Sequence, residues 1–277
     1  MNSVGTGRTK RWPSGSEYAI AVQDPSVFSD SGLRTGTLRT DMLGMPASRS
    51  GQSAIVFEVT TGDLPTAVRC FTSPPSDGKQ RYDALAEHLR ARPCSPLVPA
   101  QWVEQGVNIN GDWFPVVKME WAPGRPLNLV VEDHYDDPAV LLELSKRWID
   151  CVYELELAGI AHGDLQHGNV LVDNDARIRL VDLDGVWVPA LNGNPPRELG
   201  HPNYQHPARS YSTWGRNVDA FSALLIYVAL RALAADSSLW ERHNNGENLL
   251  FSREDLDNPG ATPLWLRWTR PEMSMSP

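Results

Sequence analysis

Three polar residues with a fixed spacing carry the strongest chemical signal in this 277-residue chain. Asp164 ends a His-Gly-Asp triplet, Asn169 follows five positions later, and Asp182 follows thirteen positions after that. An aspartate, an asparagine and a second aspartate at one rim could hold a hydroxyl nucleophile and a Mg²⁺-nucleotide together. The pattern is therefore typical of phosphoryl transfer, in which positioning and charge neutralisation supply most of the catalysis.

Two apolar runs are expected to position these side chains. Residues 170–172 are apolar, as are all of 178–181 except Arg179, and the polar turn 173–175 lies between the two runs, which predicts a loop followed by a β-hairpin. Asn169 stands at the start of this hairpin and Asp182 at its end. The hairpin would therefore present the polar groups at the same rim.

The rest of the chain reads as an α+β fold in two parts. Apolar periodicity predicts strands at 53–60, 67–71, 98–107 and 113–121, and helices at 79–92, 139–158, 218–235 and 253–256. The break at Ala122-Pro123-Gly124 separates a strand-rich part from a helical part. We therefore expect an extension over residues 1–40, a strand-rich lobe over 41–122 and a helical lobe over 123–277.

Composition excludes several classes of protein. The net charge of −9 argues against nucleic acid as a partner, because binding phosphate backbones needs clustered positive charge. The sequence contains no run of about 18 consecutive apolar residues, so we expect no transmembrane helix. The first fifteen residues are polar and lack the apolar stretch of a secretory signal. The three cysteines are widely spaced and show no metal-ligand pattern, so we expect reduced thiols in a cytoplasmic protein.

Taken together, these motifs resemble the eukaryotic-type protein kinase superfamily over residues 51–235. The His-Gly-Asp loop and the Gly-His-Pro-Asn-Tyr-Gln-His-Pro segment at 200–207 resemble, more narrowly, stand-alone bacterial serine/threonine kinase-like proteins. The resemblance implies a bilobal fold with a β-rich N-lobe, one αC helix, and a mainly helical C-lobe shortened at its C-terminus. It also implies ATP with Mg²⁺ or Mn²⁺ as cofactors, and a protein substrate or regulatory protein as partner.

The same resemblance implies a role for each polar residue. Asp164 would be the base that orients the substrate hydroxyl, and Asn169 and Asp182 would bind the metal. Arg69, in the place of the usual strand lysine, would pair with Glu87 and contact phosphate.

Other residues would bind the nucleotide or support the loop. The implied nucleotide-binding set is Gly51, Ala54, Val56, Ala67, Met119, Glu120, Ala122 and Leu171. Met119 would be the gatekeeper, and the backbone groups of Glu120 and Ala122 would bind adenine. Asp219 matches the aspartate that holds the catalytic-loop backbone from below.

The phosphate side of the implied site departs from the family pattern. Segment 49–54 keeps one of the three expected glycines, and Gln166 replaces a lysine. Arginine at position 69 is bulkier than lysine and grips phosphate with a different geometry. Lys118 is a candidate replacement cation, but strand alternation points it away from the face of Met119, which favours a solvated or structurally paired lysine.

The loop itself also departs from the pattern. Gly163 stands where the family has an arginine. Asp184 replaces the glycine of the metal-binding motif, and it could either add to metal binding or cap the turn. His162 is expected to anchor the loop rather than to act as an acid or base. His167, His201 and His206 do not have the spacing of a metal cluster.

Three functions remain open at this point. The retained Asp164, Asn169 and Asp182 favour an active serine/threonine protein kinase. The altered phosphate side favours a pseudokinase that binds nucleotide or a partner. A small-molecule phosphotransferase similar to aminoglycoside or choline kinases shares the loop spacing, but the segment at 200–207 counts against it.

Overall fold

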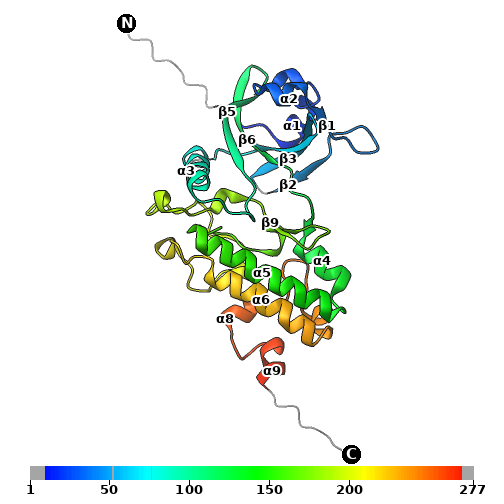
Figure 1. Cartoon of the computed structure of the whole chain (residues 1–277), viewed down its shortest axis with the longest axis vertical. Coiled ribbons are helices and arrows are strands. Elements are labelled where there is room, and N and C mark those ends of the chain that lie inside the picture. Colours follow the sequence, from blue (N-terminus) through cyan, green and yellow to red (C-terminus); the bar gives the residue numbers. More distant parts are fainter. Residues whose placement is uncertain (1–9, 52, 76, 270–277) are drawn as a thin grey trace, which may run out of the picture. The chain divides into compact units, whose positions relative to one another are not determined.

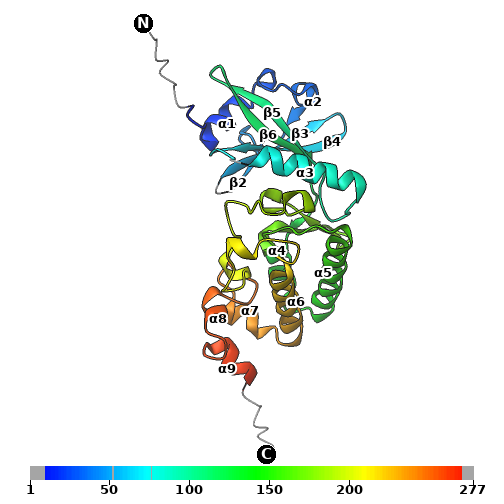
Figure 2. The same cartoon turned by 90° about the vertical axis from the view of Figure 1, so that its left-hand side faces the viewer.

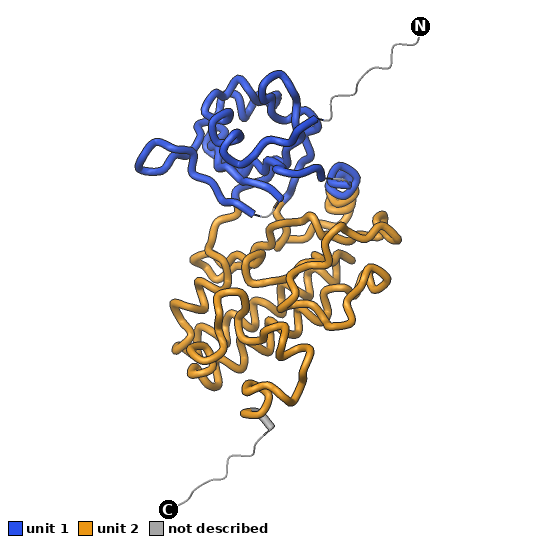
Figure 3. The backbone as a smooth tube through the Cα atoms, turned by 180° about the vertical axis from the view of Figure 1, so that it is seen from behind, with its two compact units in different colours: residues 1–83, 99–121 blue, residues 84–98, 122–277 orange. Residues whose placement is uncertain are grey.

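The computed structural model describes residues 10–51, 53–75 and 77–269. The chain has a mixed α/β architecture built from antiparallel sheets and helices, and it forms two compact units. Unit 1 contains residues 1–83 and 99–121, and unit 2 contains residues 84–98 and 122–277 (Figure 3). No helix among the described residues is long and apolar enough to cross a membrane.

Unit 1 is built on an antiparallel sheet with the strand order β1-β3-β4-β6-β5, and β2 pairs with β3 beside β1 (Figure 1). The strands are β1 Thr37–Leu38, β2 Ser48–Ser50, β3 Ala54–Thr61, β4 Leu64–Phe71, β5 Ala100–Ile109 and β6 Asp112–Glu120. Two hairpins account for most of the pairing. The turn at Gly62 joins β3 to β4, and Asn110-Gly111, both with positive φ, joins β5 to β6.

Two short helices precede this sheet, α1 Gly15–Ala21 and α2 Ser31–Thr35. A capping box between Ser14 and Glu17 begins α1, and the Asp30 carboxylate accepts from the backbone of Leu33 to begin α2. Both helices contribute to the apolar core of the unit. Buried side chains from this segment pack with those of the strands: Tyr18, Val22, Phe28 and Leu33 against Phe57, Val68 and Val116. Residues 10–38 are thus part of the core of unit 1.

Unit 2 is mainly helical. Its helices are α4 Leu127–His134, α5 Pro138–Ala158, α6 Ala220–Ala235, α7 Ser238–His243, α8 Arg253–Asp257 and α9 Pro263–Thr269, and it also contains the second half of α3 Gly78–Ala91. Helices α5 and α6 lie side by side (Figure 2). The indole nitrogen of Trp148 on α5 donates to the carbonyl of Ala223 on α6 at 2.8 Å, so a buried hydrogen bond joins the two helices.

A small antiparallel sheet in unit 2 carries the hairpin predicted from the sequence. Its strands are β7 Arg125–Pro126, β8 Val170–Val172 and β9 Ile178–Leu180, in the order β7-β8-β9. Helix α5 ends before this region because Gly159 takes a left-handed conformation with φ 70°. Residues 190–219, which lack apolar periodicity, form 3₁₀ turns at Pro202–Tyr204 and Tyr211–Thr213 joined by irregular chain.

Candidate functional site

The hairpin brings the predicted polar residues into one region of unit 2. Asn169 ends the 3₁₀ turn His167–Asn169 and leads directly into β8, while Asp182 follows β9. The backbone N–H of Val181 donates to the carbonyl of Asn169 at 3.0 Å. The chain at Asp182 therefore runs beside the chain at Asn169, as the hairpin pattern predicted.

Asp164 is held by hydrogen bonds to both of its carboxylate oxygens. Its Oδ2 accepts from Nδ2 of Asn169 at 3.2 Å, and the same nitrogen donates to the Asp164 backbone carbonyl at 2.9 Å. Its Oδ1 accepts from the backbone N–H of His201 at 2.8 Å. These contacts fix the orientation of a half-buried carboxylate, as an acceptor for a substrate hydroxyl requires.

Asp219 anchors the loop from the start of α6. Its carboxylate accepts from the backbone N–H groups of His162 and Gly163, the latter at 2.8 Å. Burial raises the pKa of the Asp219 carboxyl, while the neighbouring His162, these two backbone donors and the Arg209 guanidinium act in the opposite direction. The carboxylate thus fixes two consecutive peptide groups directly before Asp164.

His162 is a fully buried anchor of this loop. Its Nε2 lies 2.9 Å from the carbonyl of Val181, which can only accept, so Nε2 carries the proton. Its Nδ1 then accepts from the backbone N–H of Asp164 at 3.3 Å. Both ring nitrogens are used in these bonds, which matches the expected structural role and leaves no nitrogen for proton transfer.

Two features of the structure require a glycine at position 163: the backbone conformation of this residue and the closeness of Gly185. Its φ is +83°, and a Cβ at this position would lie 1.9 Å from the carbonyl oxygen of Gly185. Gly185 belongs to the 3₁₀ turn Leu183–Gly185, which includes Asp184. The backbone carbonyl of residue 185 therefore leaves no room for a side chain at position 163, where the family pattern has an arginine.

Arg209 is a supporting residue that sequence reasoning missed. Its Nη2 donates to the carbonyl of Gly163 at 3.2 Å, and its Nη1 donates to the carbonyl of Val218 at 3.1 Å. It joins the loop to the chain just before Asp219. In the sequence it is simply an arginine two positions after the 200–207 segment, which does not indicate these partners.

The 200–207 segment packs against the loop that contains Asp164 and His167. The Tyr204 hydroxyl lies 2.6 Å from Nδ1 of His167, and its backbone carbonyl accepts from Oγ of Ser222 on α6 at 2.7 Å. Burial lowers the pKa of His167 to about 4, with a smaller contribution from the nearby His201. The segment is thus bonded to the loop on one side and to α6 on the other.

The donor chemistry of this region fits a Mg²⁺ ion. Asn169 uses its amide nitrogen on Asp164, which leaves its carbonyl oxygen for a metal, and Asp182 supplies a carboxylate on a left-handed backbone with φ 64°. Mg²⁺ prefers such oxygen ligands and takes the rest from water and phosphate. Among the described residues there is no group of three or more His, Cys, Asp and Glu side chains that could hold a metal by itself.

Gln166, which replaces the family lysine, has a local structural use. Its Oε1 accepts from the backbone N–H of Gly168 at 3.0 Å and caps the 3₁₀ turn before Asn169. This side chain therefore shapes the loop, but it provides no cation for a phosphate group.

In unit 1, the predicted nucleotide-binding residues lie on neighbouring strands. Val56 on β3 faces Arg69 on β4 in the antiparallel register, and Ala67 on β4 faces Met119 on β6. The Arg69 side chain is buried, with its guanidinium 5.7 Å from the ring centroid of Phe71.

In the glycine-poor segment, the backbone N–H of Gly51 donates to the carbonyl of Ala54 at 2.9 Å. Gln52, within this loop, lies outside the described residues. Glu120 is exposed at the end of β6.

Lys118 has a carboxylate partner within unit 1. Its Nζ lies 2.9 Å from both Oδ1 and Oδ2 of Asp30, the residue that caps α2. This ion pair is three-quarters buried. The lysine is therefore structurally paired, which favours that reading over a role as the replacement phosphate cation.

The remaining predicted residues belong to unit 2. Leu171 is buried on β8 opposite Pro126, and Ala122 is buried at the start of the unit. Glu87 is exposed on α3. Because Arg69 and Glu87 belong to different units, their ion pair stays a prediction.

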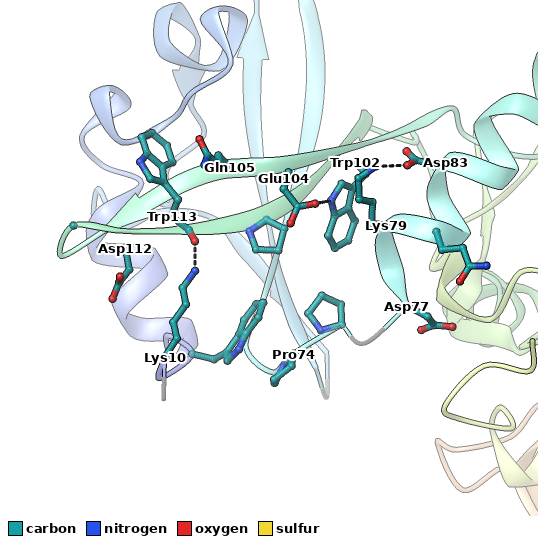
Figure 4. A pocket seen from close by; sticks show the side chains of 15 residues that line it. Lys10, Pro74, Asp77, Lys79, Asp83, Trp102, Glu104, Gln105, Asp112 and Trp113 are labelled. Atoms are coloured by element: carbon teal, nitrogen blue, oxygen red, sulfur yellow. Dashed lines mark hydrogen bonds and ion pairs between the residues drawn. The ribbon is translucent and has the colours of Figure 1, made fainter. Parts of the chain in front are cut away.

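Unit 1 also has an open hollow of about 910 Å³ (Figure 4). Three tryptophans and several charged residues line it, and none of the predicted site residues does. Its polar groups bond to one another. Trp102 Nε1 donates to Glu104 at 2.8 Å, Lys79 pairs with Asp83, and Lys10 donates to the Trp113 carbonyl.

Comparison with known proteins gives one relevant similarity. No protein-family model matches the chain. The chain is 28% identical over 127 residues to the interferon-induced, double-stranded RNA-activated protein kinase of Rattus norvegicus. This similarity supports a kinase-like relationship. The match covers 44% of this chain, which spans only 25% of that kinase.

Proposed function

We propose that this chain is an ATP- and Mg²⁺-dependent protein kinase-like phosphotransferase that transfers the γ-phosphate to serine or threonine hydroxyls. The observation that carries the proposal is the Asp164 carboxylate, oriented by Asn169 and by the backbone of His201. Its loop is tied to Asp219 through consecutive peptide groups. The kinase-like similarity supports the same conclusion.

Each residue would then have a defined part in the reaction. Bound ATP would supply the transferable phosphoryl group, and Mg²⁺ would neutralise the negative charge of the phosphates. Asp164 would accept a hydrogen bond from the substrate hydroxyl and orient its oxygen for attack. Asn169 and Asp182 would hold the metal through oxygen atoms. Asp219 and His162 would keep the loop in place while the substrate binds.

The test is transfer of label from γ-labelled ATP with Mg²⁺ or Mn²⁺, to the protein itself and to dephosphorylated casein. An Asp164→Asn variant should lose at least about 10²-fold in rate, because it keeps the size of the side chain and removes its carboxylate. A wild-type rate no higher than that of the variant would contradict the proposal.

A second candidate is a pseudokinase that binds nucleotide or a protein partner without turnover. The specific observation in its favour is Gln166, which caps its own loop where a phosphate-binding lysine is expected. Thermal unfolding with added nucleotide separates the two candidates. Nucleotide at 100 times its Kd should stabilise either protein by about 2.7 kcal/mol, but only the kinase would also transfer phosphate.

A further inference from the structure

Helix α5 exposes a stripe of large apolar side chains on its outer face. Four of them are between 37% and 62% exposed: Leu142, Ile149, Tyr153 and Leu157. Their spacing of seven, four and four residues places them on one face of the helix, over a length of about 22 Å. Among the described residues, α6 and β4 each expose a single large apolar side chain, Leu224 and Leu64. A contiguous stripe marks an interaction surface, whereas single exposed leucines are ordinary.

The opposite face of α5 is already used in the core of unit 2. Its buried apolar side chains are Leu141, Leu144, Trp148, Cys151 and Leu155. The indole of Trp148 also bonds to α6. A helix at the surface of a globular domain needs one apolar face to pack on its core, so the second apolar face of α5 needs another explanation.

The charged residues of α5 restrict the kind of partner that could cover this stripe. Lys146 lies within the stripe and is 75% exposed, and its contact with Glu143 is long, at 3.8 Å. Asp150, one turn after Lys146, is exposed and forms no ion pair among the described residues. The remaining charges of the outward part of the helix are mostly carboxylates, at positions 143, 154 and 156. A surface of anionic lipid would therefore be repelled.

The stripe is complementary to itself when two copies of α5 run antiparallel. A two-fold axis at the midpoint between residues 149 and 150 would place Leu142 against Leu157 of the second copy, because the two leucines are equally far from this midpoint. Lys146 and Tyr153 are equally far from it as well. Each exposed leucine would therefore meet a leucine, and each lysine would meet an aromatic ring, which attracts an ammonium group.

The same pairing supplies Asp150 with a cation. Asp150 lies three residues before Tyr153, so these two side chains are neighbours on the helix surface. The ammonium group of Lys146 in one copy would therefore lie close to both Tyr153 and Asp150 of the other. Because the axis is two-fold, this charged pair would occur twice in the dimer.

We propose that the outer face of α5 is a homodimer interface, through which two copies of this chain pack with their α5 helices antiparallel. The occupant is a second copy because one two-fold axis matches the apolar residues and the opposite charges at the same time. A stripe on one helix is small for a protein interface, so the dimer is weak and forms as the concentration rises. This inference does not depend on the proposed phosphotransferase function.

The first test is the molar mass of the full chain, measured by light scattering over a series of protein concentrations. The wild-type protein should pass from monomer to dimer. Leu157→Asp should raise the Kd of the dimer at least about hundredfold, because each dimer loses this apolar contact twice. The matched control is Leu64→Asp, which changes a leucine that is 69% exposed on β4 in unit 1 and should leave the Kd unchanged.

The second test reverses the two charges. Lys146→Glu and Asp150→Lys should each raise the Kd of the dimer about tenfold, because each sets like charges against one another. The double variant Lys146→Glu/Asp150→Lys restores both pairs in exchanged form, so its Kd should return to within about threefold of the wild-type value. Circular dichroism of every variant shows that a lost dimer is not a lost fold.

Three results would overturn the proposal. The first is a wild-type protein that stays monomeric at the highest concentration measured. The second is a dimer whose Kd is the same in Leu157→Asp, since such a dimer uses another surface. The third is a double charge variant that does not recover, because Lys146 and Asp150 would then not face each other across the interface.

Discussion

At the scale of single residues, the conformation around Asp164 depends on glycine at positions 163 and 200. Gly163 lies against the carbonyl of Gly185, and Gly200 lies between Asp164 and Gln205. In both places a Cβ would meet a neighbouring polar group at less than 3 Å. An arginine could not replace Gly163 without displacing the turn at Leu183–Gly185. The backbone of this turn therefore requires a glycine at position 163.

Gly163→Ala should lower stability more than the strained backbone alone explains. The left-handed conformation costs a non-glycine residue about 1–2 kcal/mol. The collision with the Gly185 carbonyl should add about 1–3 kcal/mol, the range for an overpacked site. Urea unfolding followed by circular dichroism measures the difference.

Gly193→Ala is the matched control, because Gly193 also lies in unit 2, has φ +80° and has nothing within 4 Å of its missing Cβ. Its free energy of unfolding should fall only by the cost of a left-handed conformation in a non-glycine residue. Equal losses in the two variants would mean that the contact with Gly185 contributes nothing.

At the scale of elements, the long and periodic segments could be predicted, as could the short hairpin β8–β9 and the short helix α8, whereas several other short helices could not. Helices α5 and α6 begin within two residues of the predicted starts, because their apolar stripes extend over several turns. Helices α1, α2 and α4 were not predicted, since five to eight residues carry too little periodicity. Side-chain caps at Ser14 and Asp30 stabilise α1 and α2, whereas α4 has no side-chain cap and buries Leu127 and Val131.

The candidate site also contains some residues whose positions the sequence predicts and others whose positions it does not. The spacing of Asp164, Asn169 and Asp182 is local, so the hairpin and its polar rim could be read from the sequence. The role of Arg209 could not, because its contacts depend on how a segment without periodicity folds back on the loop. The partner of Lys118 was also hidden, since Asp30 lies 88 residues earlier in the chain.

The contact between the 200–207 segment and the catalytic loop should make stability depend on pH. The His167 pKa falls from 6.5 to about 4 in the fold because the ring is buried. Between these values the unfolded chain binds a proton that the folded chain does not, so stability falls as pH drops through this window. The full effect is up to about 3 kcal/mol.

Urea titrations at pH 7.5, 5.5 and 4.5 measure this dependence. His167→Gln should remove most of the difference between the two ends of the range, whereas Tyr204→Phe keeps the imidazole and should retain a large part of it. If the slope of the wild-type protein persists in His167→Gln, other groups are responsible for it.

At the scale of the whole molecule, the predicted residues for nucleotide, phosphate and metal belong to two different units. Val56, Ala67 and Arg69 belong to unit 1, while Leu171 and Asp182 belong to unit 2. A nucleotide that binds the folded chain adds its binding free energy to the stability of that chain. The nucleotide affinity of substituted proteins should therefore show whether Arg69 or Lys118 contacts the phosphates.

Arg69→Met and Lys118→Met provide that comparison. Lys118 is bonded to both oxygens of Asp30, so its loss should cost about 1–3 kcal/mol of stability and leave nucleotide affinity unchanged. Arg69 is the proposed phosphate-binding cation, so its loss should weaken nucleotide affinity at least about tenfold, equivalent to one charged hydrogen bond. Thermal unfolding over a series of ATP concentrations with Mg²⁺ gives both quantities, because the midpoint without nucleotide reports stability and its shift reports affinity. The reverse pattern, with affinity lost in Lys118→Met and kept in Arg69→Met, would assign the phosphate contact to Lys118 instead.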